Sequence, residues 1–128
     1  MIKIAKGNFD VNIVLQEDRA VTGLARMTID KQLFGDLEGT TQGQMLSART
    51  DTANSAGYVA IERVTGMLHG RKGNFVLQHN GEMNRGAYSL KITVVPDSGT
   101  EELAGITGNF TINIVEKKHF YEFTYELP

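Results

Sequence analysis

The stretch NFTINIVEKKHFYEFTYEL, residues 109–127, decides the fold class. Apolar and polar side chains alternate along both of its halves, on either side of a turn at Lys117-Lys118. The apolar positions are Phe110, Ile112 and Ile114 in the first half, and Tyr121, Phe123, Tyr125 and Leu127 in the second. A period of two residues is typical of a strand with one buried and one exposed face. The stretch therefore predicts two antiparallel strands joined by a short turn.

The same alternation and regularly spaced turns extend along the rest of the chain. Turn signals fall at Glu17-Asp18-Arg19, Gly35-Asp36, Asp51-Thr52-Ala53-Asn54, Gly70-Arg71-Lys72-Gly73, Asn84-Arg85-Gly86, Pro96-Asp97-Ser98-Gly99 and Lys117-Lys118. Gly, Asn and Asp tolerate the backbone angles that tight hairpins require, and Pro presets a turn. These signals divide the chain into eight segments of about 10–13 residues. The one helical candidate, Gly99–Ala104, is long enough for a single turn.

Eight consecutive antiparallel strands with short connections predict a closed barrel. An open sheet would leave two long unpaired edges, which closure removes by pairing the last strand with the first. The fold class is therefore all-β, a closed eight-stranded antiparallel meander barrel, and residues 1–128 are expected to form a single domain. A two-sheet sandwich is the alternative, although its crossovers normally need longer connections.

Composition and charge exclude several classes of protein. Cysteine is absent, which excludes a disulfide scaffold, and 41% hydrophobic residues argue against disorder. Thirteen Lys and Arg against fifteen Asp and Glu give a net charge of −2 with no basic run, so nucleic-acid binding is not expected. No stretch approaches the ~20 apolar residues of a membrane span, and no signal peptide is recognisable. The expected location is the cytoplasm.

The middle segments break the clean alternation. Neither face of residues 37–48 is convincingly apolar. In residues 58–68, one strand phase places Glu62 inside the barrel and the other places Arg63 there. Further on, His79 shares a face with Phe75 and Leu77. Polar groups therefore lie on faces that should be core, and such local exceptions are where function is sought.

Two interpretations of these polar residues are open. In the first, Glu62, His79 and Gln44 converge on a partly wet pocket, where a carboxylate and an imidazole serve as general acid and base. In the second, Glu62 pairs with Arg63 or a cross-strand group, and His79 is a satisfied core histidine. The candidate cavity residues are Glu62, His79, Gln44, Tyr58, Phe75, Leu77, Arg63 and Gln78. No catalytic residue is assigned.

Apolar side chains on both faces of the segment 58–68 predict that something covers the outside of the barrel. Val59 and Ile61 lie on the face opposite Tyr58 and Ala60. Since no helix is expected, a second copy of the chain is the simplest cover, so a homo-oligomer is expected and a dimer is favoured.

Metal and cofactor motifs are not recognisable. His69, His79 and His119 lie far apart without a second ligand at metal-binding spacing, so no metal is expected. The glycines make no phosphate-binding loop, and no serine lies in a nucleophile elbow. No cofactor is therefore expected.

Four strings, taken in order, carry a family resemblance. They are FGDLEG (34–39), YVAIERVTG (58–66), GRKGNFVLQHNG (70–81) and VVPDSGTEELAGITG (94–108). The chain resembles a family of small bacterial proteins of unknown function with an allene oxide cyclase-like barrel. The resemblance implies an eight-stranded closed meander barrel and supplies no activity.

Better-known relatives by fold, the allene oxide cyclases and dirigent proteins, are oligomers that hold an apolar reactive intermediate inside the barrel. They steer its cyclisation or coupling. The cyclases resemble this chain only in a buried carboxylate such as Glu62, because the cysteine they also use is absent here. Their chemistry therefore does not carry over.

Two functions remain as hypotheses. The first is a barrel that binds a small apolar or amphipathic ligand between Phe75, Leu77 and Tyr58, with isomerisation or cyclisation as the reaction class. The alternative is a non-catalytic oligomeric structural or interaction protein whose barrel is filled by side chains. A cavity beside Glu62 and His79 would favour the first function.

Overall fold

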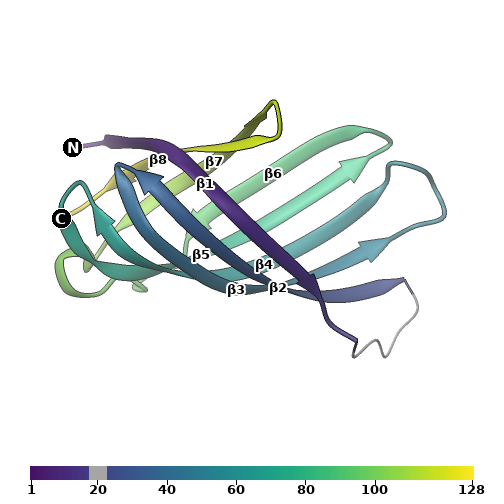
Figure 1. Cartoon of the computed structure of the whole chain (residues 1–128), viewed down its shortest axis with the longest axis horizontal. Helices are drawn as coiled ribbons and strands as arrows, with labels where there is room; N and C mark the ends of the chain where they lie inside the picture. The colour runs from purple at the N-terminus through teal and green to yellow at the C-terminus, as the bar shows by residue number, and fades with distance from the viewer. Residues whose placement is uncertain (18–22) are drawn as a thin grey trace.

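The chain folds into a closed barrel of antiparallel strands, seen in a computed structural model that describes residues 1–17 and 23–128 (Figure 1). Each strand pairs with its neighbour in sequence, and β8 pairs with β1 to close the barrel. The elements are β1 (Lys3–Leu15), β2 (Leu24–Gly35), β3 (Leu37–Arg49), β4 (Ala56–Leu68), β5 (Arg71–Asn84), β6 (Ala87–Val94), η1 (Glu101–Leu103), β7 (Thr107–Val115) and β8 (Lys118–Glu126). The predicted eight-stranded meander barrel is confirmed.

The connections lie at or next to the predicted turn signals, but Arg71, Lys72 and Gly73 belong to β5 and Lys118 to β8. His69 and Gly70 lie between β4 and β5, and Arg85 and Gly86 between β5 and β6, all four with positive φ. The expected helical turn is the 3-10 helix η1. The first predicted turn, Glu17-Asp18-Arg19, lies mostly outside the described residues.

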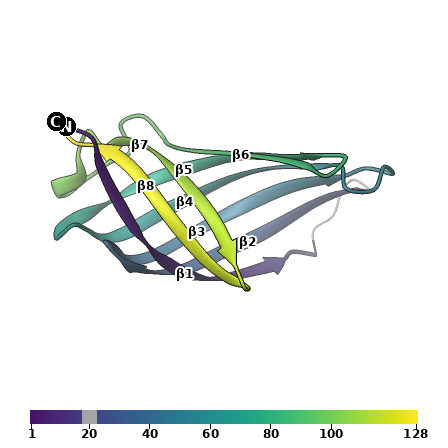
Figure 2. The ribbon, with the colours of Figure 1, turned by 90° about the horizontal axis from the view of Figure 1, so that it is seen from above.

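One end of the barrel is filled by side chains. Both termini and the β2–β3 and β4–β5 turns lie at this end (Figures 1 and 2). The connected core consists of Ala5, Phe9, Leu33, Leu37, Val64, Leu68, Phe75, Leu77, Ile92, Val94, Leu103, Ile106, Phe110, Tyr121, Phe123 and Tyr125. Stacked aromatic pairs, such as Phe75 on Phe123 with ring centroids 5.4 Å apart, occupy its centre. We call this part of the barrel the filled half.

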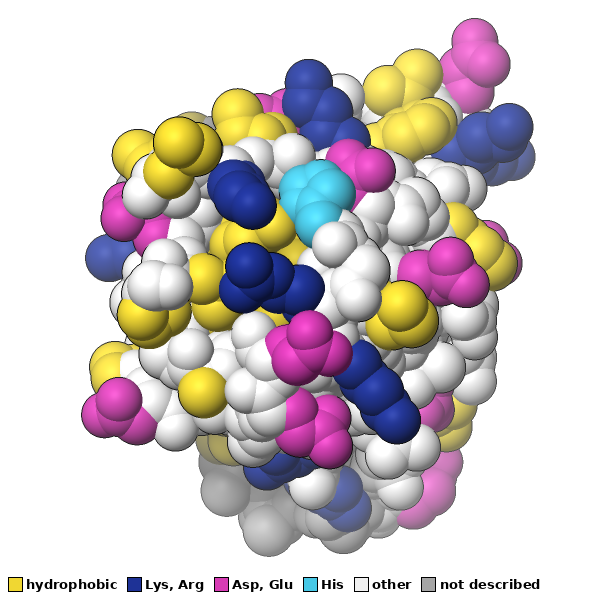
Figure 3. Space-filling view, turned by 90° about the vertical axis from the view of Figure 1, so that its left-hand side faces the viewer, with side chains coloured by type: hydrophobic (Ala, Val, Ile, Leu, Met, Phe, Trp, Pro, Cys, Tyr) yellow, Lys and Arg dark blue, Asp and Glu magenta, His cyan; other side chains and the backbone are white. Residues whose placement is uncertain are grey.

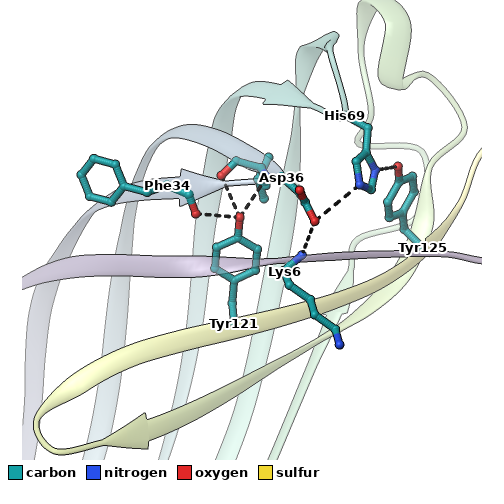
Figure 4. Close-up of polar contacts among 7 residues, drawn as sticks. Lys6, Phe34, Asp36, His69, Tyr121 and Tyr125 are labelled. Atoms are coloured by element: carbon teal, nitrogen blue, oxygen red, sulfur yellow. Dashed lines mark hydrogen bonds and ion pairs between the residues drawn. The ribbon is translucent and has the colours of Figure 1, made fainter.

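Polar contacts tie the filled end together across strands distant in sequence (Figure 4). The Tyr121 hydroxyl accepts a hydrogen bond from the Leu37 backbone N–H at 2.9 Å and lies 3.0 Å from the Phe34 carbonyl oxygen. The Asp36 carboxylate accepts the Lys6 backbone N–H at 2.9 Å and lies 3.6 Å from His69 Nε2. Viewed from outside, this end shows one histidine among Lys, Arg, Asp and Glu side chains (Figure 3).

The other half of the barrel is open to solvent. Ile13 follows Phe9 in the period-two phase that faces the interior, yet it is 49% exposed. Ile114 follows Phe110 in the same way and is 60% exposed. Strands β2 to β6 extend beyond the β7–β8 hairpin at this end (Figure 1). Side chains that face inward and stay exposed indicate an interior without enough neighbours to fill it, and we call this part the open half.

Candidate functional site

A cluster of three ionisable side chains lies on the inner face of the barrel wall. Glu62 Oε1 is 3.0 Å from Lys31 Nζ and 2.6 Å from His79 Nε2. All three residues are buried, and the side chains of Lys31 and His79 keep 6% and 4% of their area exposed. We call them the Lys31–Glu62–His79 cluster.

Strand phase turns these polar side chains inward. Lys31 lies between buried Ile29 and Leu33 on β2, and Glu62 between buried Ala60 and Val64 on β4. A shift of the strand register by one residue would turn the buried apolar neighbours of Lys31 and Glu62 toward solvent. Packing of these neighbours therefore determines that the two charged side chains face inward. The structure therefore selects the phase that places Glu62 inside and Arg63 outside.

Strand register brings the cluster together. Ala60 is the cross-strand partner of His79, so Glu62 and His79 are diagonal neighbours on the inner face of β4 and β5. Lys31 lies on β2, and its ammonium reaches across β3 to Glu62. Gly43 of β3 makes this reach feasible, because it stands opposite Glu62 without a side chain. A Cβ at Gly43 would lie 2.6 Å from Glu62 Cβ.

Electrostatics keep Glu62 ionised. Burial raises the pKa of the Glu62 carboxyl, but the hydrogen bond with His79 and the charge of Lys31 outweigh burial and lower it to about 2. Lys31 also lies 4.9 Å from the centroid of the Phe9 ring, a distance suited to a cation–π contact. The cluster thus holds a compensated pair of charges inside the wall.

Two buried oxygens in this region have no hydrogen-bond partner among the described residues. They are Glu62 Oε2 and Thr41 Oγ1. Thr41 lies on β3 as the cross-strand partner of Lys31 on one side and of Val64 on the other. A buried polar atom without a partner costs about 1–3 kcal/mol, so such an atom calls for an explanation.

Tyr58 borders the cluster on the side of the open half. Its ring centroid lies 6.2 Å from that of His79, and the ring covers Gly81 on β5. Burial, followed by the neighbouring Tyr88 and the charge of Glu62, raises the pKa of the Tyr58 phenol above its usual value. The phenol is therefore neutral at ordinary pH.

The other predicted site residues divide between the two faces of the wall. Leu77 pairs with Glu62 inside the barrel, and Phe75 lies in the core of the filled half. The outward phase carries Gln44, Arg63 and Gln78, so none of the three side chains lies on the inner face with Glu62. Gln44 and Gln78 line a concavity of the outer face that His79 also borders. The Gln44 side chain accepts a hydrogen bond from Arg26 at 2.9 Å on the outer face instead.

Lys31 and Thr41 are site residues that the sequence-based candidates omit. The signal for Lys31 is present, since it falls midway between Ile29 and Leu33 in a clear period-two pattern. Thr41 carries a weaker signal because its strand has two glycines, Gly39 and Gly43, on the inward face.

The cluster also fixes the chemistry available to His79. If Glu62 accepts the proton on Nε2, the lone pair of the neutral ring lies on Nδ1, which then serves as a base. Among the described residues, no three His, Cys, Asp or Glu side chains group as metal ligands. Within the same residues, no helix has the length and apolar character to cross a membrane.

The outer face of the wall carries a separate concavity of about 640 Å³. It is lined by Arg26, Gln44, Leu46, Val59, Ala60, Ile61, Gln78, His79, Asn80, Lys91 and Thr93. Leu46, Val59 and Ile61 are about half exposed there, and Leu46 pairs directly with Val59. The predicted two-sided apolar character of β4 is thus present in the structure.

Fold and site together define a class of protein: a small meander barrel, filled at one end, with a buried lysine–glutamate–histidine cluster beside an open half. The particular family is DUF3224, a family of unknown function, whose sequence model matches residues 5–125. The chain belongs to this family, which confirms the resemblance to a bacterial family without known activity.

A solved relative agrees over the whole fold. The chain is similar to a crystal structure of a protein of unknown function from the DUF3224 family of Shewanella oneidensis MR-1. The two are 46% identical, with a TM-score of 0.94 over 100% of this chain and 98% of that one. No curated protein matches the chain. The likeness to allene oxide cyclases is not tested by these comparisons and stays a prediction.

Proposed function

We propose that the open half of the barrel binds one small apolar or amphipathic molecule, and that the Lys31–Glu62–His79 cluster contacts its polar part. The observation that carries this proposal is the row of cross-strand partners Ile13, Ile29, Gly43, Glu62 and Leu77. The row begins at Ile13, which faces the interior and is exposed. It passes Gly43, which has no side chain, and reaches Glu62, whose buried Oε2 has no hydrogen-bond partner among the described residues.

The chemistry of the open half suits an apolar body with one polar group. Val11, Leu90 and Ile112 pack partly buried against the core, and Ile13 and Ile114 face the interior while exposed. Binding pockets for small molecules are typically apolar with a few placed polar groups. The cluster supplies those groups, and the neutral Tyr58 phenol supplies another beside it.

A neutral fluorescent probe, N-phenyl-1-naphthylamine, tests binding in the open half. Ile13 and Ile61 are 49% and 53% exposed, the first facing the interior and the second the outer wall. Ile13→Thr is expected to weaken probe binding about fivefold, because it removes about 1 kcal/mol of apolar contact. Ile61→Thr is the matched control and should leave the dissociation constant unchanged.

Equal loss in both variants, or no probe binding by the wild type, would contradict the proposal. Native mass spectrometry of the purified protein gives an independent readout, in which a mass beyond that of the chain identifies a retained small molecule.

If the protein turns its ligand over, the His79–Glu62 pair favours proton transfer. A carboxylate that orients an imidazole leaves the far ring nitrogen as a general base. Isomerisation or cyclisation of the bound molecule is the reaction class that this pair would serve. A hydrolytic nucleophile does not form part of the cluster.

A homodimer through the outer wall is a second proposal, favoured by Leu46, Val59 and Ile61. A second copy that places the same surface against this one would cover these half-exposed side chains by twofold symmetry. Light scattering is expected to give twice the mass of the chain, and Val59→Asp should shift the protein to a monomer. A monomeric wild type would contradict the dimer.

We also propose a cytoplasmic location without nucleic-acid binding. The absence of cysteine and the net charge of −2 support both parts. Cell fractionation with a reporter-tagged chain would test the location.

A further inference from the structure

We infer that the polar group recognised at the cluster is a neutral hydroxyl, that of an alcohol, a phenol or an enol, held by Glu62 Oε2 and Thr41 Oγ1. This inference rests on the proposed function and names the chemical class of the ligand. It excludes a carboxylate headgroup, which a buried lysine and histidine would otherwise suggest.

The two unpartnered oxygens lie on neighbouring strands of the inner wall. Thr41 stands opposite Val64, and Glu62 precedes Val64 by two residues, so Thr41 and Glu62 are diagonal neighbours on one face. Their Cβ atoms are then about 7 Å apart, a span that one small polar group can bridge. Both oxygens are fully buried.

Gly43 brings the backbones of β3 and β4 close together beside the two oxygens. It follows Thr41 by one inward position and stands directly opposite Glu62. An added Cβ there would lie 2.3 Å from the Ile61 carbonyl oxygen and 2.6 Å from Glu62 Cβ. A side chain is thus excluded at Gly43, so the inner face beside the two oxygens is bare backbone. We call the unpartnered oxygens Glu62 Oε2 and Thr41 Oγ1 the niche.

The donor and acceptor properties of the niche select a hydroxyl. An ionised carboxylate oxygen only accepts hydrogen bonds, whereas a threonine hydroxyl both donates and accepts. A ligand hydroxyl donates its proton to Glu62 Oε2 and accepts the proton of Thr41 Oγ1. Both buried atoms are then satisfied by one group.

Charged headgroups fit the niche poorly. A ligand carboxylate would place its oxygens against Glu62 Oε2, while Lys31 already pairs with Glu62 Oε1 at 3.0 Å. A ligand ammonium would add a second cation to a carboxylate that Lys31 and His79 already contact. In a buried site, either arrangement leaves a charge without compensation.

Three ligands with one alkyl chain test the inference: 4-octylphenol, 4-octylanisole and 4-octylbenzoate, titrated calorimetrically at pH 7.5. The anisole is neutral like the phenol but has no proton to donate. The phenol is expected to bind about tenfold more tightly than the anisole, the size of one buried hydrogen bond, and far more tightly than the benzoate.

Thr41→Val is the variant that isolates the niche, because valine has the shape of threonine without the hydroxyl. It removes an unpartnered buried oxygen, so the fold should be retained or stabilised. Affinity for the phenol is expected to fall by about threefold to tenfold, because the phenol oxygen loses the proton that Thr41 donates. Thr41→Ser keeps the hydroxyl and should preserve the preference for the phenol.

The outcomes separate this inference from the proposed function. Equal binding of phenol and anisole, tighter binding of benzoate, or an unaltered affinity for the phenol in Thr41→Val would overturn the hydroxyl site and leave apolar binding in the open half standing. Failure of all three ligands and of the naphthylamine probe would overturn the cavity itself.

Discussion

Glu62 carries a negative charge on the buried inner face of the barrel, and two neighbouring side chains stabilise this charge. Lys31 and His79 both contact the same carboxylate oxygen, while the other oxygen stays unpartnered among the described residues. Removal of one member of a buried ion pair costs more than the pair contributes, because the remaining charge is left buried and uncompensated. The cluster is therefore sensitive to single substitutions.

Lys31→Met is expected to destabilise the protein by about 3–5 kcal/mol, since it leaves the Glu62 charge with His79 alone. Urea unfolding measures the change. Lys6→Met is the control, because Lys6 forms an exposed ion pair with Glu122 at 3.9 Å that is expected to contribute less than about 1 kcal/mol. A similar loss of unfolding free energy in Lys31→Met and Lys6→Met would contradict the description of Glu62 as buried and ionised.

Stability should also depend on pH through Glu62. Its pKa in the folded protein is about 2, against a usual value of 4.5, so the folded state binds this proton less readily than the unfolded chain. The stabilisation is fully present above pH 4.5 and is lost as the pH falls toward 2. Unfolding free energies across this range should show a smaller slope for Glu62→Gln than for the wild type.

An identical slope in the two proteins would mean that Glu62 does not titrate as described. If Glu62→Gln alone does not fold, the double variant Lys31→Met with Glu62→Gln removes both charges together and provides the same comparison.

At the residue scale, two of the three members of the cluster were candidates from the sequence. Glu62 and His79 stand out because each interrupts an apolar face. Lys31 lies two strands away from Glu62, and only the register of β2, β3 and β4 reveals that its ammonium reaches across Gly43. Gln44, Arg63 and Gln78 were also candidates from the sequence, and strand phase sends them outward.

Among the elements, β3 has the most unusual composition and the most specific role. Its inward face carries Gly39, Thr41 and Gly43, so it lines the wall without filling the interior. This explains why neither of its faces reads as apolar from sequence alone. A strand with few core side chains on its inward face gives a weak period-two signal.

Gly43→Ala is expected to destabilise β3 strongly, because the added Cβ would overlap the Ile61 carbonyl oxygen and Glu62 Cβ. Thermal unfolding should show a loss of about 2 kcal/mol or more. Gly57→Ala on β4 is the matched control, since its Cβ would meet only one atom, at 3.9 Å. An unchanged unfolding free energy for Gly43→Ala would contradict this expectation, because β3 and β4 would then be able to move apart beside Glu62.

The seam between β6 and β7 is the weakest part of the closure. These strands share a single register position, Thr93 with Asn109, whereas β3 and β4 pair along their full length. The sequence predicted that the barrel closes, because eight strands were counted, but it held no signal for how completely each pair forms. Register depends on inter-strand packing, which a single strand's pattern does not encode.

On the scale of the whole molecule, the two halves of the barrel differ in how their interior is packed. The filled half contains the connected core with its stacked aromatic rings and holds the fold together. The open half keeps inward-facing isoleucines in contact with solvent, and the Lys31–Glu62–His79 cluster lies between the two halves. This division was not predictable, because both halves show the same alternation in sequence.

The most direct test of ligand binding in the open half is a methyl NMR titration of isoleucine-labelled protein with N-phenyl-1-naphthylamine. The account predicts that the methyl signals of Ile13 and Ile114, inside the open half, shift on titration. Those of Ile4 and Ile61, on the outer face, should stay in place. Shifts confined to Ile4 and Ile61, with Ile13 and Ile114 unmoved, would contradict it.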